Sequence, residues 1–220
     1  LLSVPPGADG DPVLKQHGGD IAARAGDIVW AGYLSTTGVY GDRAGGWVDE
    51  SSTLAPATQR GQRRVEAEAG WCRLWRDAGL PIHLFRLAGI YGPGRNALET
   101  VRSGKARRVV KEGQVFSRTH VADIATILEA SIARPHPGAA YNVCDDDPAP
   151  PQEVVTHACE LLGVDPPPEI SFEDAEMSEM GRSFYAESKR VSNRRIKEEL
   201  GVELAYPDYR AGLAALLADS

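Results

Sequence analysis

Apolar residues along the chain form two short unbroken runs with a helical pattern between them. The runs are residues 28–36 (IVWAGYLST) and 81–92 (PIHLFRLAGIYG), and both have the length of a strand. Between them, within residues 58–78, apolar side chains recur at helical spacing. These positions are Val65, Ala69, Cys72 and Trp75, and Gly79 and Pro81 follow as end signals. The pattern predicts a strand, a helix and a second strand, and the first run is typical of a strand buried on both faces of a parallel sheet.

The same alternation continues on both sides of this unit. Asp11 and Pro12 are a start signal for a helix. Further helices are predicted over 121–132 and 154–162, with a short strand at 139–145 between them. Alternating strands and helices predict an α/β sheet with right-handed crossovers.

The pattern changes after Gly163. Residues 165–190 contain three consecutive prolines and little periodicity, and two short helices follow. One is predicted to be capped by Ser192 and to end at Gly201, and the other to start near Asp208. This part of the chain is expected to form a small lobe of its own.

Charge and cysteine content narrow the function classes. The 24 Lys and Arg residues against 31 Asp and Glu residues give a net charge of -7, which disfavours a nucleic-acid-binding surface. The three cysteines lie far apart without CxxC spacing, so we expect neither a disulfide scaffold nor a zinc site. The five histidines show no metal-binding spacing, and no apolar run reaches the length of a membrane span. The sequence therefore favours a cytoplasmic protein with no metal, nucleic acid or membrane as partner.

Five sequence blocks occur in an order known from one protein family. They are YLSTTGVYGDRAGGWVDE (33–50), RLAGIYGPG (86–94), RTHVADIA (118–125), AAYNVCDDDP (139–148) and SNRRIKEELG (192–201). In these blocks the chain resembles the extended short-chain dehydrogenase/reductases, which include the NAD-dependent epimerases and dehydratases. The resemblance implies a Rossmann-type parallel sheet flanked by helices in residues 1–150, and a smaller C-terminal lobe in 151–220 to which 96–117 contributes. It also implies NAD or NADP as cofactor, a sugar, polyol or sugar-nucleotide as the small-molecule substrate, and a homodimer.

The glycine-rich turn that holds the dinucleotide pyrophosphate in this family has no counterpart in the 220 residues. By the resemblance, the segment LLSVPP at residues 1–6 matches the fourth strand of the family's sheet. We therefore expect two strand–helix units and a third strand upstream, on the order of 60 residues. The residue that selects NAD or NADP would lie there as well.

The family's catalytic pair, a Tyr followed four positions later by a Lys, falls on Arg60 and Arg64. Thr36 takes the position of the Ser or Thr that orients the substrate. A guanidinium with a pKa above about 12 cannot exchange a proton at neutral pH, so Arg60 cannot do the work of the tyrosine. Arg64 could still bind ribose or phosphate oxygens. The alternatives are that both arginines belong to a solvated helix face and that Thr36 only ends its strand.

Further site residues follow from the resemblance. Cofactor contacts are expected at Ser3, Val4, Pro5, Ser35, Thr36, Arg64, Leu87, Ala88, Gly89 and Ile90. Substrate contacts are expected at Tyr91, Arg118, His120 and Tyr185, with Lys189 in the same lobe. Tyr40 and Tyr91 could take over the proton transfer, or they pack loops against the sheet. Asp145, Asp146 and Asp147 precede a proline and are predicted to be solvated.

Two function classes remain open at this point. The first is an NAD(P)-dependent oxidoreductase, epimerase or dehydratase with an atypical active site. The second is a dinucleotide-binding sensor or regulatory protein without turnover, and the replacement of the tyrosine by Arg60 favours it.

Overall fold

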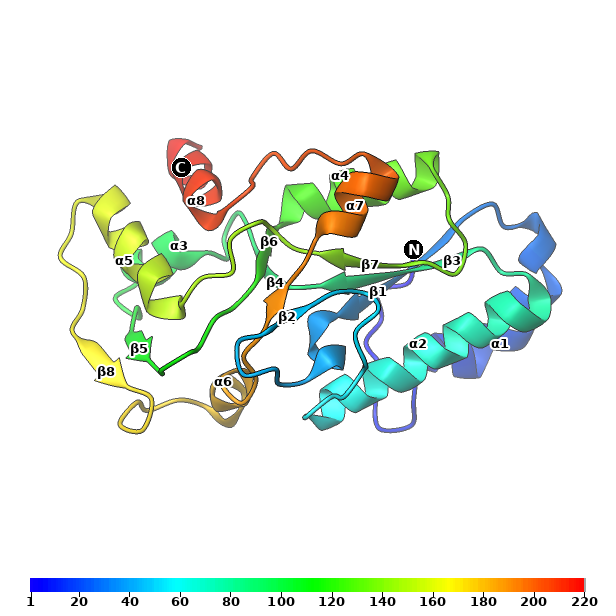
Figure 1. Ribbon diagram of the computed structural model, residues 1–220, viewed down its shortest axis with the longest axis horizontal. Coiled ribbons are helices and arrows are strands. Elements are labelled where there is room, and N and C mark those ends of the chain that lie inside the picture. The colour runs from blue at the N-terminus through cyan, green and yellow to red at the C-terminus, as the bar shows by residue number, and fades with distance from the viewer. Residues whose placement is uncertain (220) are drawn as a thin grey trace.

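A parallel three-stranded sheet lies at the centre of the structure, a computed structural model that describes residues 1–219 (Figure 1). Its strands are β1 (Ala31–Thr36), β3 (Ile82–Leu87) and β7 (Ala140–Val143), in the order β1-β3-β7. Leu2 adds a parallel bridge to Tyr33, so the first residues of the chain extend the sheet beyond β1. Parallel strands flanked by helices confirm the predicted Rossmann-type α/β class.

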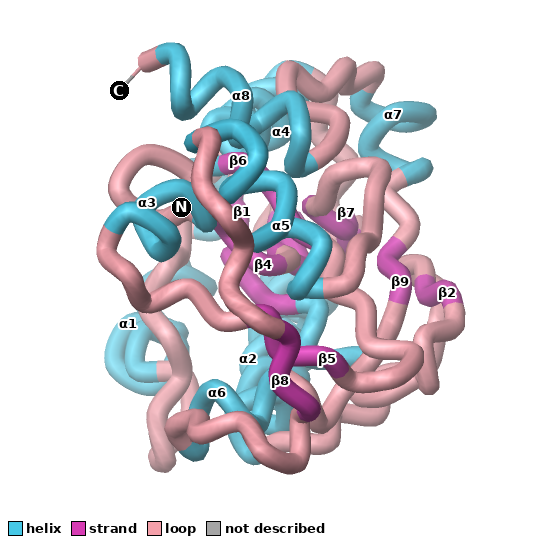
Figure 2. The backbone as a smooth tube through the Cα atoms, turned by 90° about the vertical axis from the view of Figure 1, so that its left-hand side faces the viewer, coloured by secondary structure: helices cyan, strands magenta, loops and turns pink. Residues whose placement is uncertain are grey.

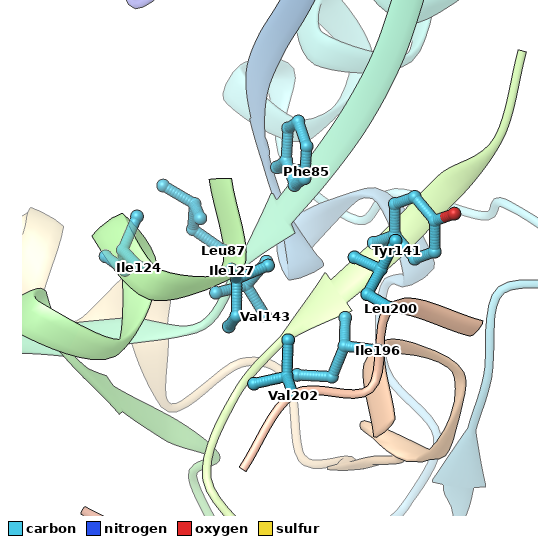
Figure 3. Packing of buried hydrophobic residues seen from close by; sticks show 9 residues of the cluster. All are labelled: Phe85, Leu87, Ile124, Ile127, Tyr141, Val143, Ile196, Leu200 and Val202. Carbon is cyan, nitrogen blue, oxygen red and sulfur yellow. The ribbon is translucent and has the colours of Figure 1, made fainter. Parts of the chain in front are cut away.

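Helices cover both faces of this sheet. On one face lies α2 (Gln59–Ala78) with α1 (Pro12–Ala23) beside it, and on the other lie α4 (Val121–Ala133) and α7 (Arg194–Leu200) (Figure 1). Alternate residues of a strand point to opposite faces of the sheet, so the side chains of one strand pack against the helices on both faces. Figure 3 shows the α4 and α7 layer, in which Phe85 and Leu87 of β3 pack with Tyr141 and Val143 of β7.

Asp11 joins α1 to α2. Its Oδ1 accepts hydrogen bonds from the backbone N–H groups of Val13 and Leu14, at 2.9 and 3.1 Å, and so caps α1. Its Oδ2 accepts a bond of 3.0 Å from Nε1 of the fully buried Trp71 on α2. One carboxylate therefore satisfies a helix end and a buried indole.

We expect Asp11→Ala to lower the free energy of unfolding by about 2 kcal/mol, because the helix loses its cap and a buried N–H loses its acceptor. Urea unfolding followed by circular dichroism measures the loss. Asp9→Ala is the matched control, since the exposed Asp9 lies just outside the helix. Equal losses in the two variants would contradict the role assigned to Asp11.

Three more parallel strand pairs lie outside the central sheet in residues 1–219. They are β2 (Trp47–Val48) with β9 (Arg190–Val191), β4 (Gly89–Tyr91) with β6 (Arg118–His120), and β5 (Arg108–Val110) with β8 (Glu169–Ser171). The other helices are α3 (Ala97–Arg102), α5 (Pro151–Leu162), α6 (Glu179–Phe184) and α8 (Tyr209–Ala218). Figure 2 shows β5 and β8 side by side, and α3, α5 and α8 share a separate apolar core. The segment that contains α3 and β5 therefore packs against elements from the last third of the chain.

Some predicted elements have different limits in the structure. The first strand begins at Ala31 rather than Ile28, because Val29 is 89% exposed. The second apolar run is divided at Ala88, since β4 leaves the central sheet and pairs with β6. Helix α7 begins after Asn193 rather than directly after Ser192. Across residues 1–219, no helix has the length and apolar character that crossing a membrane requires.

Candidate functional site

A cleft of about 470 Å³ opens at the carboxyl ends of β1 and β3. Its walls come from the end of β1, the first turn of α2, the segment 87–91, the segment 115–118 and the segment 181–191. In open parallel sheets, ligands bind outside the carboxyl ends of the strands, where loops from neighbouring units meet. This cleft is therefore the candidate site.

Thr36 ends β1 and lines the cleft. Its Oγ1 accepts a hydrogen bond of 3.2 Å from the N–H of Gly38 and so starts the single helical turn Thr37–Tyr40. An oxygen that accepts this bond keeps its own proton free for donation. Thr36 can therefore fix the backbone and still donate a hydrogen bond to a ligand.

Arg60 lies in the first turn of α2, behind the cap that Thr58 forms with the N–H of Gly61. It lines the cleft, and its guanidinium carbon lies 4.9 Å from the centre of the Phe184 ring. Its guanidinium makes no hydrogen bond or ion pair with a residue in the described range 1–219. Arg60 is thus a cation that lies over an aromatic ring at the edge of the cleft.

Arg64 is directed to the sheet instead. Its Nη1 donates to the hydroxyl of Tyr33 at 3.0 Å and to the carbonyl of Leu34 at 2.7 Å. It is not among the residues that line the cleft. Arg64 and Arg60 share a helix face, but Arg64 fastens α2 to β1 while Arg60 reaches the cleft.

A buried polar network lies beneath this end of the cleft. The carboxylate of Glu68 on α2 accepts two hydrogen bonds from Arg86 of β3, at 3.2 and 2.8 Å, and one of 2.5 Å from Ser35. Arg86 also donates to the hydroxyl of Tyr40 at 2.9 Å, and Tyr40 donates to Asn142 at 2.7 Å. Ser35, expected to contact the cofactor, is 4% exposed and points its hydroxyl into this network.

Tyr40 is fully buried, and burial raises its pKa to about 12. Such a phenol keeps its proton at neutral pH and has no contact with the cleft. Between the two alternatives for Tyr40, the structure supports packing.

The segment from Leu87 to Ile90 forms one wall of the cleft. The N–H of Ala88 donates to Val143 at 3.0 Å, and the N–H of Gly89 donates to Ser117 at 3.1 Å. A side chain at Gly89 would place its Cβ 3.3 Å from the same Ser117 carbonyl, which is tighter than ordinary contact. The glycine therefore lets β4 approach β6, and the wall presents small and apolar groups.

Three of the four residues expected on the substrate side line the cleft: Tyr91, Arg118 and Tyr185. The Tyr185 ring lies edge-on to Phe116, with centroids 5.4 Å apart. The fourth residue, His120, lies outside the cleft and is 5% exposed. Its Nδ1 accepts a bond of 3.3 Å from the N–H of Ala122 at the start of α4, and burial lowers its pKa. His120 is thus a neutral helix cap.

The three residues expected to contact the cofactor near the N-terminus, Ser3, Val4 and Pro5, are exposed and do not line the cleft. The cleft does contain residues that the sequence did not single out. The ring of Phe184 contacts the guanidinium of Arg60. Oε2 of Glu187 accepts a hydrogen bond of 2.6 Å from Lys189, and its Oε1 is buried without a hydrogen-bond partner in residues 1–219. They lie in the proline-rich stretch without periodicity, where no pattern marks them.

Asp145 corrects one prediction. It is 2% exposed rather than solvated, and neither carboxyl oxygen has a hydrogen-bond partner in the described chain. Burial raises its pKa to about 8. Its two neighbours behave differently, since Asp146 pairs with Lys197 and Asp147 with Arg210 at the surface.

Comparison with known proteins places the chain in a family. It is similar to a functionally unknown conserved protein from Silicibacter pomeroyi DSS, with 55% identity and a TM-score of 0.92 over 100% of this chain and 78% of that one. The chain belongs to the family of that protein. It is also 33% identical over 178 residues to Protein YeeZ of Escherichia coli K12, which covers 80% of this chain. The chain spans 58% of the length of that curated relative, and no family model matches it.

Solved structures with lower sequence identity share the fold of this chain. A dTDP-glucose 4,6-dehydratase from Bacillus anthracis str. Ames, solved in complex with NAD, is 20% identical, with a TM-score of 0.69 over 85% of this chain and 60% of that one. This likeness agrees with the Rossmann-type sheet that the sequence blocks imply.

Proposed function

We propose that this protein is an NAD(P)-dependent oxidoreductase or epimerase that acts on a sugar, a polyol or a sugar-nucleotide. The cleft at the carboxyl ends of β1 and β3, with Thr36 on one wall and the small groups of Ala88 and Gly89 on another, carries the proposal. The fold shared with a dehydratase solved in complex with NAD supports it.

The residues of this wall fit a nicotinamide ring. Leu87, Ala88 and Ile90 offer apolar surface, and Gly89 keeps the strand end free of bulk. These four residues would hold the ring, and the bound nicotinamide would supply or accept a hydride. The 220 residues contain no Gly-x-x-Gly-x-x-Gly sequence, so they do not supply a glycine-rich turn of that type to bind the pyrophosphate of the dinucleotide.

On the substrate side, Thr36 donates a hydrogen bond that orients a substrate hydroxyl. Arg60 does not transfer a proton, because a guanidinium stays charged at neutral pH. It instead presents positive charge at the Thr36 end of the cleft. Arg64 acts through the position of α2, which it ties to Tyr33 and Leu34.

A second candidate function is a dinucleotide-binding sensor without turnover. The observation that favours it is Arg60, a group that cannot exchange a proton at the position where the family has its acid/base. Both candidate functions require binding of a dinucleotide. They differ in whether a substrate bound in the cleft is converted to a product.

One experiment tests both candidates. We expect the full-length protein to bind NADH or NADPH, measured by nicotinamide fluorescence. Arg60→Tyr combined with Arg64→Lys restores the family's pair, and we expect it to raise turnover of dTDP-glucose or UDP-glucose by about a hundredfold if the cleft is catalytic. Arg63→Lys, on the same helix and outside the cleft, is the control. Binding without turnover in any variant would support the sensor, and failure to bind either dinucleotide would refute both candidates.

A further inference from the structure

The charge of the cleft is opposite to that of the chain. The chain has a net charge of -7, but the charged residues that line the cleft are Arg60, Arg118 and Lys189 against Glu187 alone. Lys189 and Glu187 form an ion pair of 2.6 Å, with both side chains about nine-tenths buried. Their charges cancel, so the two arginines give the cleft an excess of positive charge.

Neither arginine forms an ion pair with a carboxylate among residues 1–219. Arg60 contacts the ring of Phe184, which orients the guanidinium and leaves its N–H groups free for a ligand. Arg118 donates from Nη1 to the carbonyls of Phe116 and Ala149, at 2.8 and 3.1 Å, and no carboxylate in residues 1–219 pairs with it. Arg60 is exposed, so its guanidinium is open to a ligand that enters the cleft. Arg118 is largely withdrawn from solvent, and a desolvated cation without an ion-pair partner gains from a negative ligand group.

Asp145 is the carboxyl group with the largest electrostatic effect on Arg118, but it does not offset the excess positive charge of the cleft. Asp145 follows β7, and its backbone N–H donates to the carbonyl of Arg118 at 2.7 Å. Burial raises the pKa of its carboxyl to about 8 against the opposing charge of Arg118, and Asp147 is paired with Arg210. Tyr91 and Tyr209 also face Arg118, and burial raises the pKa of both phenols, so both keep their protons at neutral pH.

The cleft also offers a place for a hydroxyl group. Oε1 of Glu187 is buried, lacks a hydrogen-bond partner in the described part of the chain, and belongs to a residue that lines the cleft. A buried acceptor of this kind is costly unless a ligand supplies a donor. Thr36 offers a donor from the β1 side.

We propose that the cleft binds a hydroxylated anion, a sugar or polyol that carries a phosphate or carboxylate group, with that group held by Arg60 at the Thr36 end. Arg118 adds positive charge from β6, and Glu187 accepts from a hydroxyl. The sugar or polyol part of this inference rests on the proposed function. The planar guanidinium of Arg60 suits both phosphate and carboxylate, which share this chemistry.

Binding of four probes to the full-length protein tests the inference: glucose, glucose 6-phosphate, glucuronate and inorganic phosphate. We expect titration calorimetry at low salt to show the two charged sugars binding at least about tenfold more tightly than glucose. Arg60→Gln should remove most of this difference, and Arg63→Gln should keep it, because Arg63 contacts Gln59 and does not line the cleft. The stronger of the two charged sugars identifies the phosphate or the carboxylate as the preferred group.

Equal binding of glucose and the charged sugars, no binding of either charged sugar, or an unchanged preference in Arg60→Gln would each overturn the inference. Inorganic phosphate binding as tightly as glucose 6-phosphate would overturn the role of the hydroxyl groups. The NADH titration is independent of these results. A protein that prefers charged sugars and binds no dinucleotide would refute the proposed function and keep the anion site, and the reverse result would refute the anion site alone.

Discussion

Replacing Glu68 by alanine is expected to lower the free energy of unfolding by about 3–5 kcal/mol, because it leaves a buried charge without its partner. The side chains of Glu68 and Arg86 are 4% and 7% exposed, and their closest atoms are 2.8 Å apart. Without the carboxylate, the guanidinium of Arg86 keeps, among residues 1–219, only its bonds to Tyr40 and to the backbone carbonyl of Glu50. Ser35 loses its acceptor as well.

Urea unfolding at neutral pH measures this loss. Glu66→Ala is the matched control, since Glu66 is an exposed glutamate on the same helix with a contact of 3.3 Å to Gln62. We expect the control to change stability by no more than about 0.5 kcal/mol. If Glu68→Ala costs no more than Glu66→Ala, the pair does not stabilise the fold in the way its burial indicates.

The same pair has a consequence for the cleft. Ser35 and Arg86 each precede a residue that lines the cleft, Thr36 and Leu87. Glu68 therefore ties α2 to the ends of β1 and β3 immediately beneath the candidate site. Loss of the carboxylate should disturb ligand binding in addition to stability, since the two strand ends lose a common partner.

The longer elements could be predicted from the sequence because they carry repeated signals. Helix α2 has an apolar spacing over 20 residues, a capping Thr58 and a left-handed Gly79 at its end. The short strands carry no such signal. Trp47 and Val48 form a two-residue strand only because they meet Arg190 and Val191, which lie far away in the sequence. The tertiary structure determines such pairing, so a local sequence pattern cannot predict these short strands.

The site could be predicted only in part, for a related reason. The resemblance to the family predicted Thr36, Arg60 and Arg64 as site residues, and the first two line the cleft. Helical spacing predicted Arg64 on the same helix face as Arg60. The acceptors that divert Arg64, the hydroxyl of Tyr33 and the carbonyl of Leu34, become neighbours only when α2 packs on β1. Asp145 is a second example. Three consecutive aspartates before a proline predict a solvent-exposed turn. In the structure, the backbone N–H of Asp145 donates to the carbonyl of Arg118, and the Asp145 side chain is buried.

Asp145→Asn is expected to stabilise the protein at alkaline pH and to leave its stability nearly unchanged at pH 4. Burial raises the pKa of the folded carboxyl to about 8, whereas an unfolded Asp titrates near 3.9. The stability associated with this proton is fully present below about pH 4 and is lost as the pH rises to about 8, because only the unfolded state ionises in that window. Each pH unit in the window costs about 1.4 kcal/mol, so the asparagine variant should gain about 3–5 kcal/mol at pH 8.

Unfolding by urea at several pH values between 4 and 9 checks this expectation. The difference in unfolding free energy between Asp145→Asn and the wild type should grow with pH and level off above about pH 8. Asp147→Asn provides the control, because Asp147 is 40% exposed at its side chain and paired with Arg210. Its stability difference should not increase over the same range. A constant difference for Asp145→Asn would mean that the carboxyl ionises normally in the folded protein, and Arg118 would then have its counterion within the protein.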